Sequence, residues 1–207
     1  VAPNKLAPVL AMLESGGKGA VSIAATTACA GVAVSIITLT GLGLKFSGMI
    51  VDLAGQSVLL TTFFAAIAIW ILGLAVPVTA SYIIAAVVIV PALTKVGVPD
   101  FAAHMFIFYY AVLADVSPPT ALAPSAAAAL TGGKPFRTMM LAWKSCLPAF
   151  LVPFMFCLSP DGVGLLLMSK SWVTTAWTFA TSVLAVGALA VSFGGWMIRS
   201  ASILERL

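Results

Sequence analysis

Long apolar runs, interrupted at a few defined places, are the dominant pattern of this chain. Three of them, residues 21–41, 139–158 and 172–197, contain at most one charged residue each. A helix needs about 20 apolar residues to cross a bilayer, so each run predicts one membrane span. Pro148 and Pro153 predict kinks in the second of these spans.

Residues 45–56 show a shorter, amphipathic pattern. Their apolar positions recur at the spacing of one helix face, at Phe46, Met49, Ile50 and Leu53. Lys45, Ser47, Asp52 and Gln56 between them are polar. This pattern predicts a helix that lies along the membrane surface. The alternative is that the segment forms the irregular start of the next span.

Residues 57–93 are apolar but interrupted in the middle. The arms 57–72 and 80–93 are about 16 and 14 residues long, shorter than a bilayer-crossing helix. The segment 73–79 between them contains a glycine and a proline, which break helices. We therefore predict a re-entrant hairpin rather than two full spans. Its tip must be surrounded by protein or water, because lipid cannot satisfy non-helical backbone.

Residues 101–130 form another apolar segment, interrupted by the sequence Asp115-Val116-Ser117-Pro118-Pro119-Thr120. Proline donates no backbone hydrogen bond and blocks the preceding helical turn. The two adjacent prolines therefore predict a broken transmembrane helix. The alternative, here and at 73–79, is that the prolines only kink ordinary spans.

The two interruptions share one chemistry. Each frees backbone carbonyls, and each adds hydroxyls: Thr79 and Ser81 near the first, Ser117 and Thr120 in the second. Carbonyl and hydroxyl oxygens suit a hard cation such as Na⁺, and the N-terminal end of a half-helix suits an anion. Discontinuous helices that meet near the membrane midplane form the ion and substrate sites of secondary transporters.

One acid and the histidine lie inside the apolar segment 101–130. An acid within the membrane is a functional candidate, and we interpret Asp115 as an N-terminal cap for the half-helix that begins near Pro118. A proton site and direct Na⁺ ligation are the alternatives for Asp115. We interpret His104 as packed and hydrogen-bonded, with a proton relay as the alternative.

Polar segments connect these elements. Residues 1–20 are predicted to form a loop that contains at most a short helix around 6–14. Shorter connections are predicted at 94–100, 131–138 and 159–164, where glycine, proline and charged residues gather. Because the chain begins at Val1 rather than methionine, we expect it to be a piece of a longer protein.

The composition indicates a membrane protein. Of the 207 residues, 62% are hydrophobic and 8% are charged, whereas soluble domains carry roughly 25% charged residues. The predicted fold class is therefore an all-α polytopic membrane protein with a re-entrant hairpin and a broken transmembrane helix. The net charge of +4 comes from single lysines and arginines, which indicates membrane-flanking loops rather than a nucleic-acid partner.

Orientation follows from the positive-inside rule. If the spans alternate and the hairpin returns to the side it left, seven cations share one side: Lys5, Lys18, Lys134, Arg137, Lys144, Arg199 and Arg206. Lys45, Lys95 and Lys170 lie on the other. We therefore predict a cytoplasmic C-terminus.

Motifs for other chemistry are absent from the sequence. No zinc-protease motif, P-loop or spaced catalytic triad occurs, so we predict no enzymatic activity and no cofactor. Cys29, Cys146 and Cys157 lie singly in apolar runs and are interpreted as small buried hydrophobes, not as metal ligands or disulfide partners.

Three stretches resemble the large membrane subunit of TRAP transporters. They are ILGLAVPVTASYIIAA (71–86), PALTKVGVPDFAAHMFIFYY (91–110) and ADVSPPTALAPSAAAA (114–129). The chain is similar to the fused permeases that work with TAXI-type periplasmic binding proteins, and the similarity covers residues 20–158. The order of tip, PAL-x-K-x-G turn, AAH helix and double-proline break is specific to this family.

The resemblance implies an elevator-type transporter of the bacterial inner membrane, driven by Na⁺ and fed by a soluble binding protein. Such permeases contain two inverted repeats, each with a hairpin and a broken helix. This chain resembles the second repeat, over residues 21–158, and residues 159–207 add a further span and a tail. The first repeat and the small membrane subunit are expected in the same full-length chain.

The family's Na⁺ sites use carbonyls and hydroxyls at hairpin tips and helix breaks. Carried over by position, the implied ligands are Gly73, Val76, Pro77, Thr79, Ser117, Pro118, Pro119 and Thr120, with no other metal. Ser81 and Thr120 are the implied substrate contacts. The tip in such permeases reads closer to G-M-G-L-P-T-T, so a side-chain ligand at Val78 is lost, whereas backbone ligation is retained.

The sequence thus predicts Na⁺-coupled transport of an organic anion, a carboxylate. One alternative is an ion-coupled carboxylate transporter that needs no binding protein. Another, from a different functional class, is a membrane scaffold subunit that transports nothing, and a membrane enzyme comes last.

Overall fold

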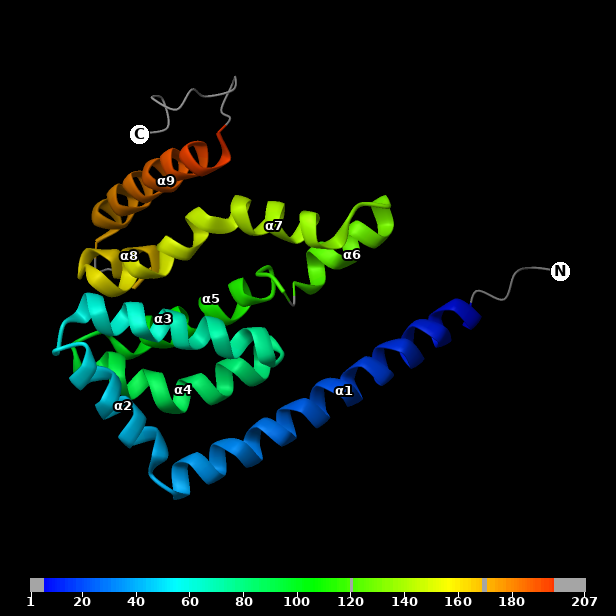
Figure 1. The fold of residues 1–207 in the computed structure, drawn as a ribbon, viewed down its shortest axis with the longest axis horizontal. Helices are drawn as coiled ribbons and strands as arrows, with labels where there is room; N and C mark the ends of the chain where they lie inside the picture. The colour runs from blue at the N-terminus through cyan, green and yellow to red at the C-terminus, as the bar shows by residue number, and fades with distance from the viewer. Residues whose placement is uncertain (1–5, 120, 169–170, 196–207) are drawn as a thin grey trace.

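The computed structural model describes residues 6–119, 121–168 and 171–195, and it contains no strand within them (Figure 1). The elements are α1 (Leu6–Leu39), α2 (Leu42–Leu53), α3 (Val58–Ala75), α4 (Val78–Lys95), α5 (Asp100–Ala114), α6 (Leu122–Thr131), α7 (Pro135–Cys146), η1 (Leu147–Leu151), α8 (Val152–Leu158), η2 (Asp161–Leu166) and α9 (Trp172–Gly194). The prediction of an all-α polytopic membrane protein is confirmed.

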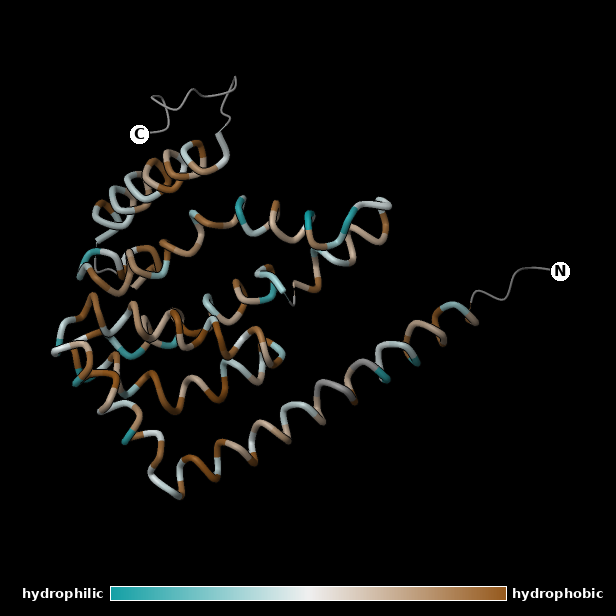
Figure 2. The backbone as a smooth tube through the Cα atoms, in the orientation of Figure 1, coloured by the Kyte–Doolittle hydropathy of each residue, from teal (hydrophilic) through white to brown (hydrophobic). Residues whose placement is uncertain are grey.

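Four of the described helical segments are long and apolar enough to cross a membrane: α3, α4, the stretch Pro135–Leu158 and α9. The inner part of α1, Ala24–Leu39, qualifies only together with α2, from which it is bent by 74°. Hydrophobic residues occur along all the helices (Figure 2). Many large apolar side chains are exposed, as expected of a protein whose outer surface faces lipid.

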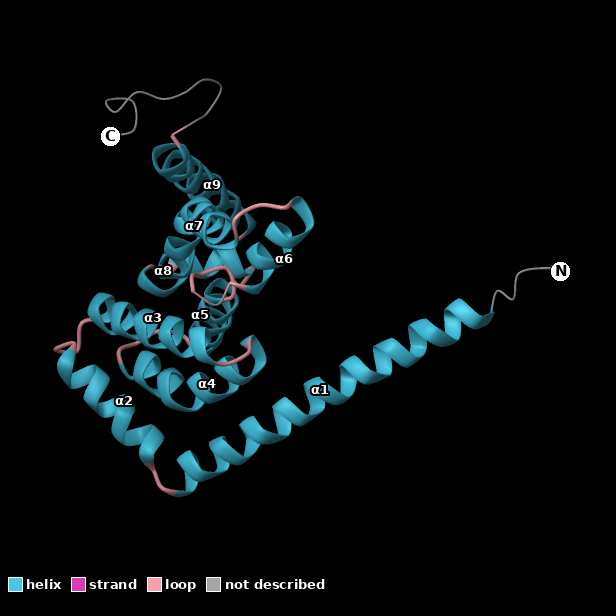
Figure 3. Ribbon diagram, turned by 45° about the vertical axis from the view of Figure 1, so that its right-hand side comes forward, coloured by secondary structure: helices cyan, strands magenta, loops and turns pink. Residues whose placement is uncertain are grey.

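The helical hairpin is present and its turn is tight. Helices α3 and α4 lie side by side, and only Val76 and Pro77 separate them (Figures 1 and 3). Each arm has 18 residues, about 27 Å of helix, rather than the shorter arms predicted. Arm length therefore does not separate a re-entrant hairpin from two spans, and re-entry remains a prediction.

The predicted N-terminal loop is wrong for residues 15–20, because α1 runs unbroken from Leu6 to Leu39, and the short helix considered around residues 6–14 is the start of this longer one. Two adjacent glycines suggested a loop, but the helix continues through them. The Lys18 ammonium contacts the Glu14 carboxylate at 2.7 Å, one turn apart, and such pairs support a helix. Residues 1–5 lie outside the described part of the chain.

Two predicted connections are shorter or more regular than expected. The 131–138 loop shrinks because α7 already begins at Pro135; a proline at the first helical position has the required φ and needs no N–H partner there. The 159–164 turn overlaps η2. Within Pro135–Leu158, the α-helix is interrupted by η1, which contains Pro148, where a kink was predicted.

Helix α2 turns its apolar face outward. Gly43, Ser47 and Val51 are buried, and α2 packs on α4 through this side. Phe46 and Met49, on the predicted membrane face, are exposed. This arrangement suits a surface helix, but α2 also fits the outer part of a broken span, and its position in the membrane remains a prediction.

The core lies where α3, α4, α5 and α8 meet. Its largest fully buried side chains include Ile69, Leu93, Phe106 and Ile107. Half of the other buried residues of this core are alanines, such as Ala102, and small residues let membrane helices approach closely. Helix α9 has no buried residue, so α3 to α5 form the packed body and α9 lies at its periphery.

The three cysteines differ in burial. Cys157 is buried, Cys146 is half-buried and Cys29 is exposed, so the interpretation as a buried hydrophobe is wrong for Cys29.

Lys170, Arg199 and Arg206 lie outside the described residues, as does the tail from residue 196 onward. The cytoplasmic C-terminus therefore remains a prediction.

Candidate functional site

The hairpin tip contains only two non-helical residues. Val76 is extended, with φ −135° and ψ 154°, and Pro77 precedes α4 with φ −58° and ψ 153°. Because Pro77 has no N–H, it cannot donate to the Gly73 carbonyl four residues earlier. The tip therefore frees a carbonyl at the end of α3, as predicted, although Gly73 and Thr79 themselves lie within helices.

Ser81 of α4 makes two hydrogen bonds to the backbone of the tip. Its fully buried hydroxyl donates to the Val76 carbonyl at 3.0 Å, and its backbone N–H donates to the Pro77 carbonyl at 2.9 Å. Both tip carbonyls are thus held by one residue of α4. The sequence implied a substrate contact for Ser81, and the structure gives its hydroxyl a local partner at the tip.

The helix break begins after Ala114 and extends to Ala121. Ser117 is buried, donates its hydroxyl to the Leu113 carbonyl at 3.0 Å and its N–H to the Ala114 carbonyl at 3.0 Å. The Pro118–Pro119 peptide bond that follows is cis. Neither proline can donate a backbone hydrogen bond. Thr120, implied as both an ion and a substrate contact, lies outside the described residues.

The tip and the break meet at Gly73 and Ala114. A Cβ atom built on Gly73 would collide with the Cβ of Ala114 and would lie 3.7 Å from the Ala111 carbonyl oxygen. The last turn of α3 therefore rests directly on the last turn of α5. Two interruptions that are about 40 residues apart in the sequence are neighbours in the fold.

Other predicted ligands are less clearly gathered. Thr79 is exposed and lines a groove of about 730 Å³ between α4 and α5. Pro77 and Pro119 are also exposed, whereas Val76 and Pro118 are half-buried. Within the described residues, no three His, Cys, Asp or Glu side chains converge.

Asp115 does not cap the second half-helix. It is the residue that ends α5, with φ −68° and ψ −17°, and it is half-buried. Helix α6 starts only at Leu122, after Ala121, and no side chain caps it. The cap prediction is wrong because the two prolines keep the backbone non-helical for longer than expected, which leaves Asp115 too far ahead of α6.

His104 is packed and hydrogen-bonded, as predicted. Its Nδ1 lies 3.0 Å from the Tyr82 hydroxyl, and the tautomer of the ring decides which group donates. The Tyr82 ring also packs edge-on against Phe108, with centroids 6.2 Å apart. Tyr82 lies about one turn beyond the tip, so this contact ties the start of α4 to α5. No motif in the sequence singles out Tyr82.

The break offers two kinds of partner. On one side, the Gly73 carbonyl at the end of α3 lacks its helical donor and the buried Ser117 hydroxyl follows the end of α5, and such oxygens favour a cation. On its other side, the N-terminus of α6 has no side-chain cap, and unsatisfied amides at a helix N-terminus favour an anion. A cation and an anion could therefore bind on the two sides of the same break.

Comparison with known proteins gives one family. No curated protein and no solved structure matches the chain significantly. The family described as "Tripartite ATP-independent periplasmic transporter, DctM component" matches residues 3–170, which confirms the resemblance to TRAP transporters. The chain therefore belongs to the DctM family, the large permease component of TRAP-type secondary transporters, which are membrane proteins that work with a periplasmic binding protein and are not enzymes.

Proposed function

We propose that this chain is the second repeat of a TRAP permease that moves an organic anion, a carboxylate, together with Na⁺ across the bacterial inner membrane. The transport domain would slide in an elevator mechanism, and a TAXI-type periplasmic binding protein would deliver the substrate. The first repeat and the small membrane subunit would belong to the same full-length chain. The observation that carries this proposal is the packing of Gly73 on Ala114.

This packing supports a cation site because it joins two sources of oxygen ligands. The Gly73 carbonyl loses its helical donor at Pro77, and the buried Ser117 hydroxyl lies just beyond Ala114. Neither source alone offers enough oxygens for Na⁺. In our proposal, these two oxygens would supply part of the Na⁺ shell, and backbone carbonyls of the Pro118–Pro119 segment would add further ligands.

The bare N-terminus of α6 supports an anionic substrate. Ala121, the residue before this helix, carries no polar side chain, so the Leu122 and Ala123 amides are left to a ligand or to water; Pro124, the third residue, has no N–H. The helix dipole adds a partial positive charge at the same end. A carboxylate bound there would lie close to the proposed Na⁺ site, and the attraction between the two ions would couple their binding.

The elevator mechanism is supported by the distribution of packing. Helices α3, α4 and α5 share one core with α8, whereas α9 has no buried residue. A tightly packed body beside a loosely attached helix is the arrangement that rigid-body sliding requires. Helix α2 packs on α4 and would connect the body to the less buried α1.

The proposal is tested with the full-length protein in liposomes, together with its binding protein and a panel of labelled carboxylates. We expect uptake of at least one carboxylate when Na⁺ is high outside, and at least ten-fold less when K⁺ or choline replaces Na⁺. Equal uptake in the absence of Na⁺ would overturn the coupling. Equal uptake without the binding protein would instead favour a stand-alone carboxylate transporter.

A further inference from the structure

The groove of about 730 Å³ between α4 and α5 is lined by polar as well as aromatic side chains. Thr79 lines it beside the hairpin tip, and Asp100, the first residue of α5, lines it too. Because Ala114, the last residue of α5, meets Gly73 near the tip, Asp100 lies about 21 Å along α5 from that contact. This α4–α5 groove therefore extends from the tip toward the polar connection between the two helices.

Tyr82 and His104 meet in the α4–α5 groove. Both side chains line it and both are half-buried, so the imidazole ring contacts the groove and is not sealed in the core. Its Nδ1 lies 3.0 Å from the Tyr82 hydroxyl, and the two ring centroids are 6.1 Å apart. Imidazole is the side chain whose charge changes between about pH 5 and 8. The groove therefore contains one group with the chemistry of a proton-binding site.

One carboxylate accompanies His104 in the groove. Asp100 lies one turn before His104 on α5, lines the same groove and forms no ion pair with another described residue. Residues one turn apart are neighbours on a helix surface, so this carboxylate would attract a positively charged imidazole ring. Lys95, the cation of α4, and Asp115, beyond the other end of α5, do not line the groove. Helix α3 carries no charged residue.

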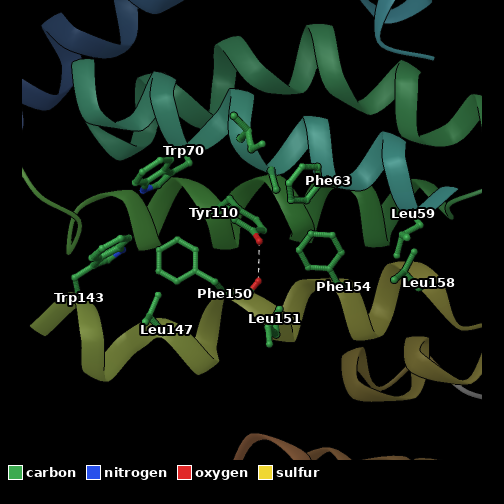
Figure 4. A pocket seen from close by; sticks show the side chains of 12 residues that line it. Leu59, Phe63, Trp70, Tyr110, Trp143, Leu147, Phe150, Leu151, Phe154 and Leu158 are labelled. Atoms are coloured by element: carbon green, nitrogen blue, oxygen red, sulfur yellow. Dashed lines mark hydrogen bonds between the residues drawn. The ribbon is translucent and has the colours of Figure 1, made fainter. Parts of the chain in front are cut away.

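The other titratable side chains around α5 lie elsewhere. The Tyr110 hydroxyl donates to the Phe150 carbonyl at 2.7 Å, on the side of η1 and α8 (Figure 4). The Cys157 thiol of α8 contacts a backbone carbonyl of α5. Tyr109 lines a separate cavity beside α9, and Asp161 of η2 is exposed and does not line the α4–α5 groove. Among the described residues, one acid and one phenol therefore share the groove with the imidazole.

We infer that His104 is a proton-binding site and that Tyr82 transmits its protonation to the hairpin tip. In neutral imidazole one ring nitrogen donates and the other accepts, so the Tyr82 hydroxyl can either donate to Nδ1 or accept from it. Once a proton binds, both ring nitrogens carry hydrogen. Tyr82 can then only accept from Nδ1, and its own hydroxyl hydrogen turns away from the ring. A hydrogen bond from the charged ring is shorter and stronger than a neutral one.

The effect on the tip follows from the position of Tyr82. It directly follows Ser81, which holds the carbonyls of Val76 and Pro77. A stronger bond between Tyr82 and His104 therefore ties the tip end of α4 more firmly to α5. The tip should open less often when the ring is protonated, so that Na⁺-driven uptake slows at low pH. This last step rests on the proposed transport function, whereas proton binding by His104 does not.

Proton binding is tested by solid-state NMR of the full-length protein in liposomes, with ¹⁵N-labelled histidine rings. The His104 signals are those that disappear in His104→Asn, whose side-chain amide offers a hydrogen-bonding group near the position of Nδ1 but does not titrate. We expect both ring-nitrogen signals to shift between about pH 5 and 8. Signals that stay unchanged over this range would overturn the inference, whatever the uptake assays show.

Transmission to the tip is tested by Na⁺-driven uptake at about pH 5.5 and 7.5, with equal pH on both sides of the membrane. We expect at least three-fold slower uptake by the unmodified protein at the lower pH, and a difference below about 1.5-fold for His104→Asn and for Tyr82→Phe. Tyr109→Phe, beside the other cavity, is the matched control and should keep the full pH effect. No pH effect in the unmodified protein, or an equal one in all four proteins, would overturn the coupling. Titration of His104 without any Na⁺-driven uptake would refute the proposed function and support the proton site.

Discussion

Gly73 packs so closely on Ala114 that not even a methyl group fits between the two helices. This contact sets the distance between the hairpin tip and the helix break. Replacing Gly73 with alanine should therefore push the tip away from the break. We expect a loss of about 1–3 kcal/mol of stability, the usual cost of overpacking, and at least ten-fold slower Na⁺-driven uptake.

The matched control for Gly73→Ala is Gly31→Ala in α1, where a new Cβ meets no other atom within 4 Å; it should leave uptake unchanged and should raise stability by up to about 1 kcal/mol, because alanine favours a helix over glycine. In the double variant Gly73→Ala, Ala114→Gly, removal of the Ala114 methyl group makes room for the new methyl group at residue 73. This variant should recover much of the lost uptake. A double variant as inactive as Gly73→Ala would refute the steric explanation. Thermal unfolding and liposome uptake are the two measurements.

Ser117 offers a second test of the cation site. Ser117→Ala removes a buried hydroxyl that donates to the Leu113 carbonyl, which should cost about 0.5–1.5 kcal/mol. If the hydroxyl oxygen also binds Na⁺, the Na⁺ concentration needed for half-maximal uptake should rise several-fold. Ser145→Ala removes the same kind of bond from an exposed position on α7 and should not change the Na⁺ dependence. An identical Na⁺ titration for Ser117→Ala would exclude Ser117 as a ligand.

Ser81→Ala tests the closure of the tip. The variant frees the Val76 carbonyl from its 3.0 Å hydrogen bond, so the tip should open more often. We expect amide hydrogen exchange at Val76 and Val78 to become at least three-fold faster. Thr94→Val removes a comparable side-chain bond at the other end of α4 and should leave exchange at the tip unaffected.

Tyr82→Phe isolates the bond to His104. The ring stays against Phe108, while the 3.0 Å hydrogen bond is lost and the His104 nitrogen is left without it. We expect a stability loss of about 0.5–1.5 kcal/mol, measured by thermal unfolding. Tyr109→Phe, on the same helix as His104, should change stability much less. Equal melting temperatures for Tyr82→Phe and the unmodified protein would mean that the bond contributes nothing.

Asp115→Ala tests whether the Asp115 side chain stabilises the protein as the N-terminal cap of a helix. Loss of a true N-terminal cap costs about 0.5–2 kcal/mol, but Asp115 ends α5 and caps no helix. We therefore expect a change in unfolding free energy below about 0.5 kcal/mol. A larger loss would show that its carboxylate stabilises the break through a contact with another part of the full-length protein.

The hairpin and the break could be predicted from the sequence because proline and glycine act on the backbone locally. Pro77 and Pro118 each remove a donor wherever they stand, so the interruptions follow from residue identity alone. The length of a helix is less local: Gly16 and Gly17 lie within α1, since a glycine costs only about 1 kcal/mol there. The position of Asp115 relative to α6 could not be predicted, because it depends on how many residues after Pro118 stay non-helical.

Contacts between distant residues were not predictable from one sequence. The pattern placed hydroxyls and prolines at the tip and at the break, but nothing in it showed that Gly73 would meet Ala114. The Trp70–Trp143 pair is a stronger case, because the two rings stack although 73 residues separate them. Each tryptophan alone looks like an ordinary membrane-anchoring residue, and only the fold brings the two rings together.

Helix α1 is longer than the membrane is thick. Its 34 residues extend about 51 Å, whereas a bilayer with its head-group regions measures about 40–45 Å. If α1 stands perpendicular to the membrane, one of its ends must therefore lie in water. The exposed Glu14–Lys18 ion pair indicates that this is the N-terminal end. If α1 tilts as one body about its C-terminal end at Leu39, the displacement grows along the helix and is largest at Leu6.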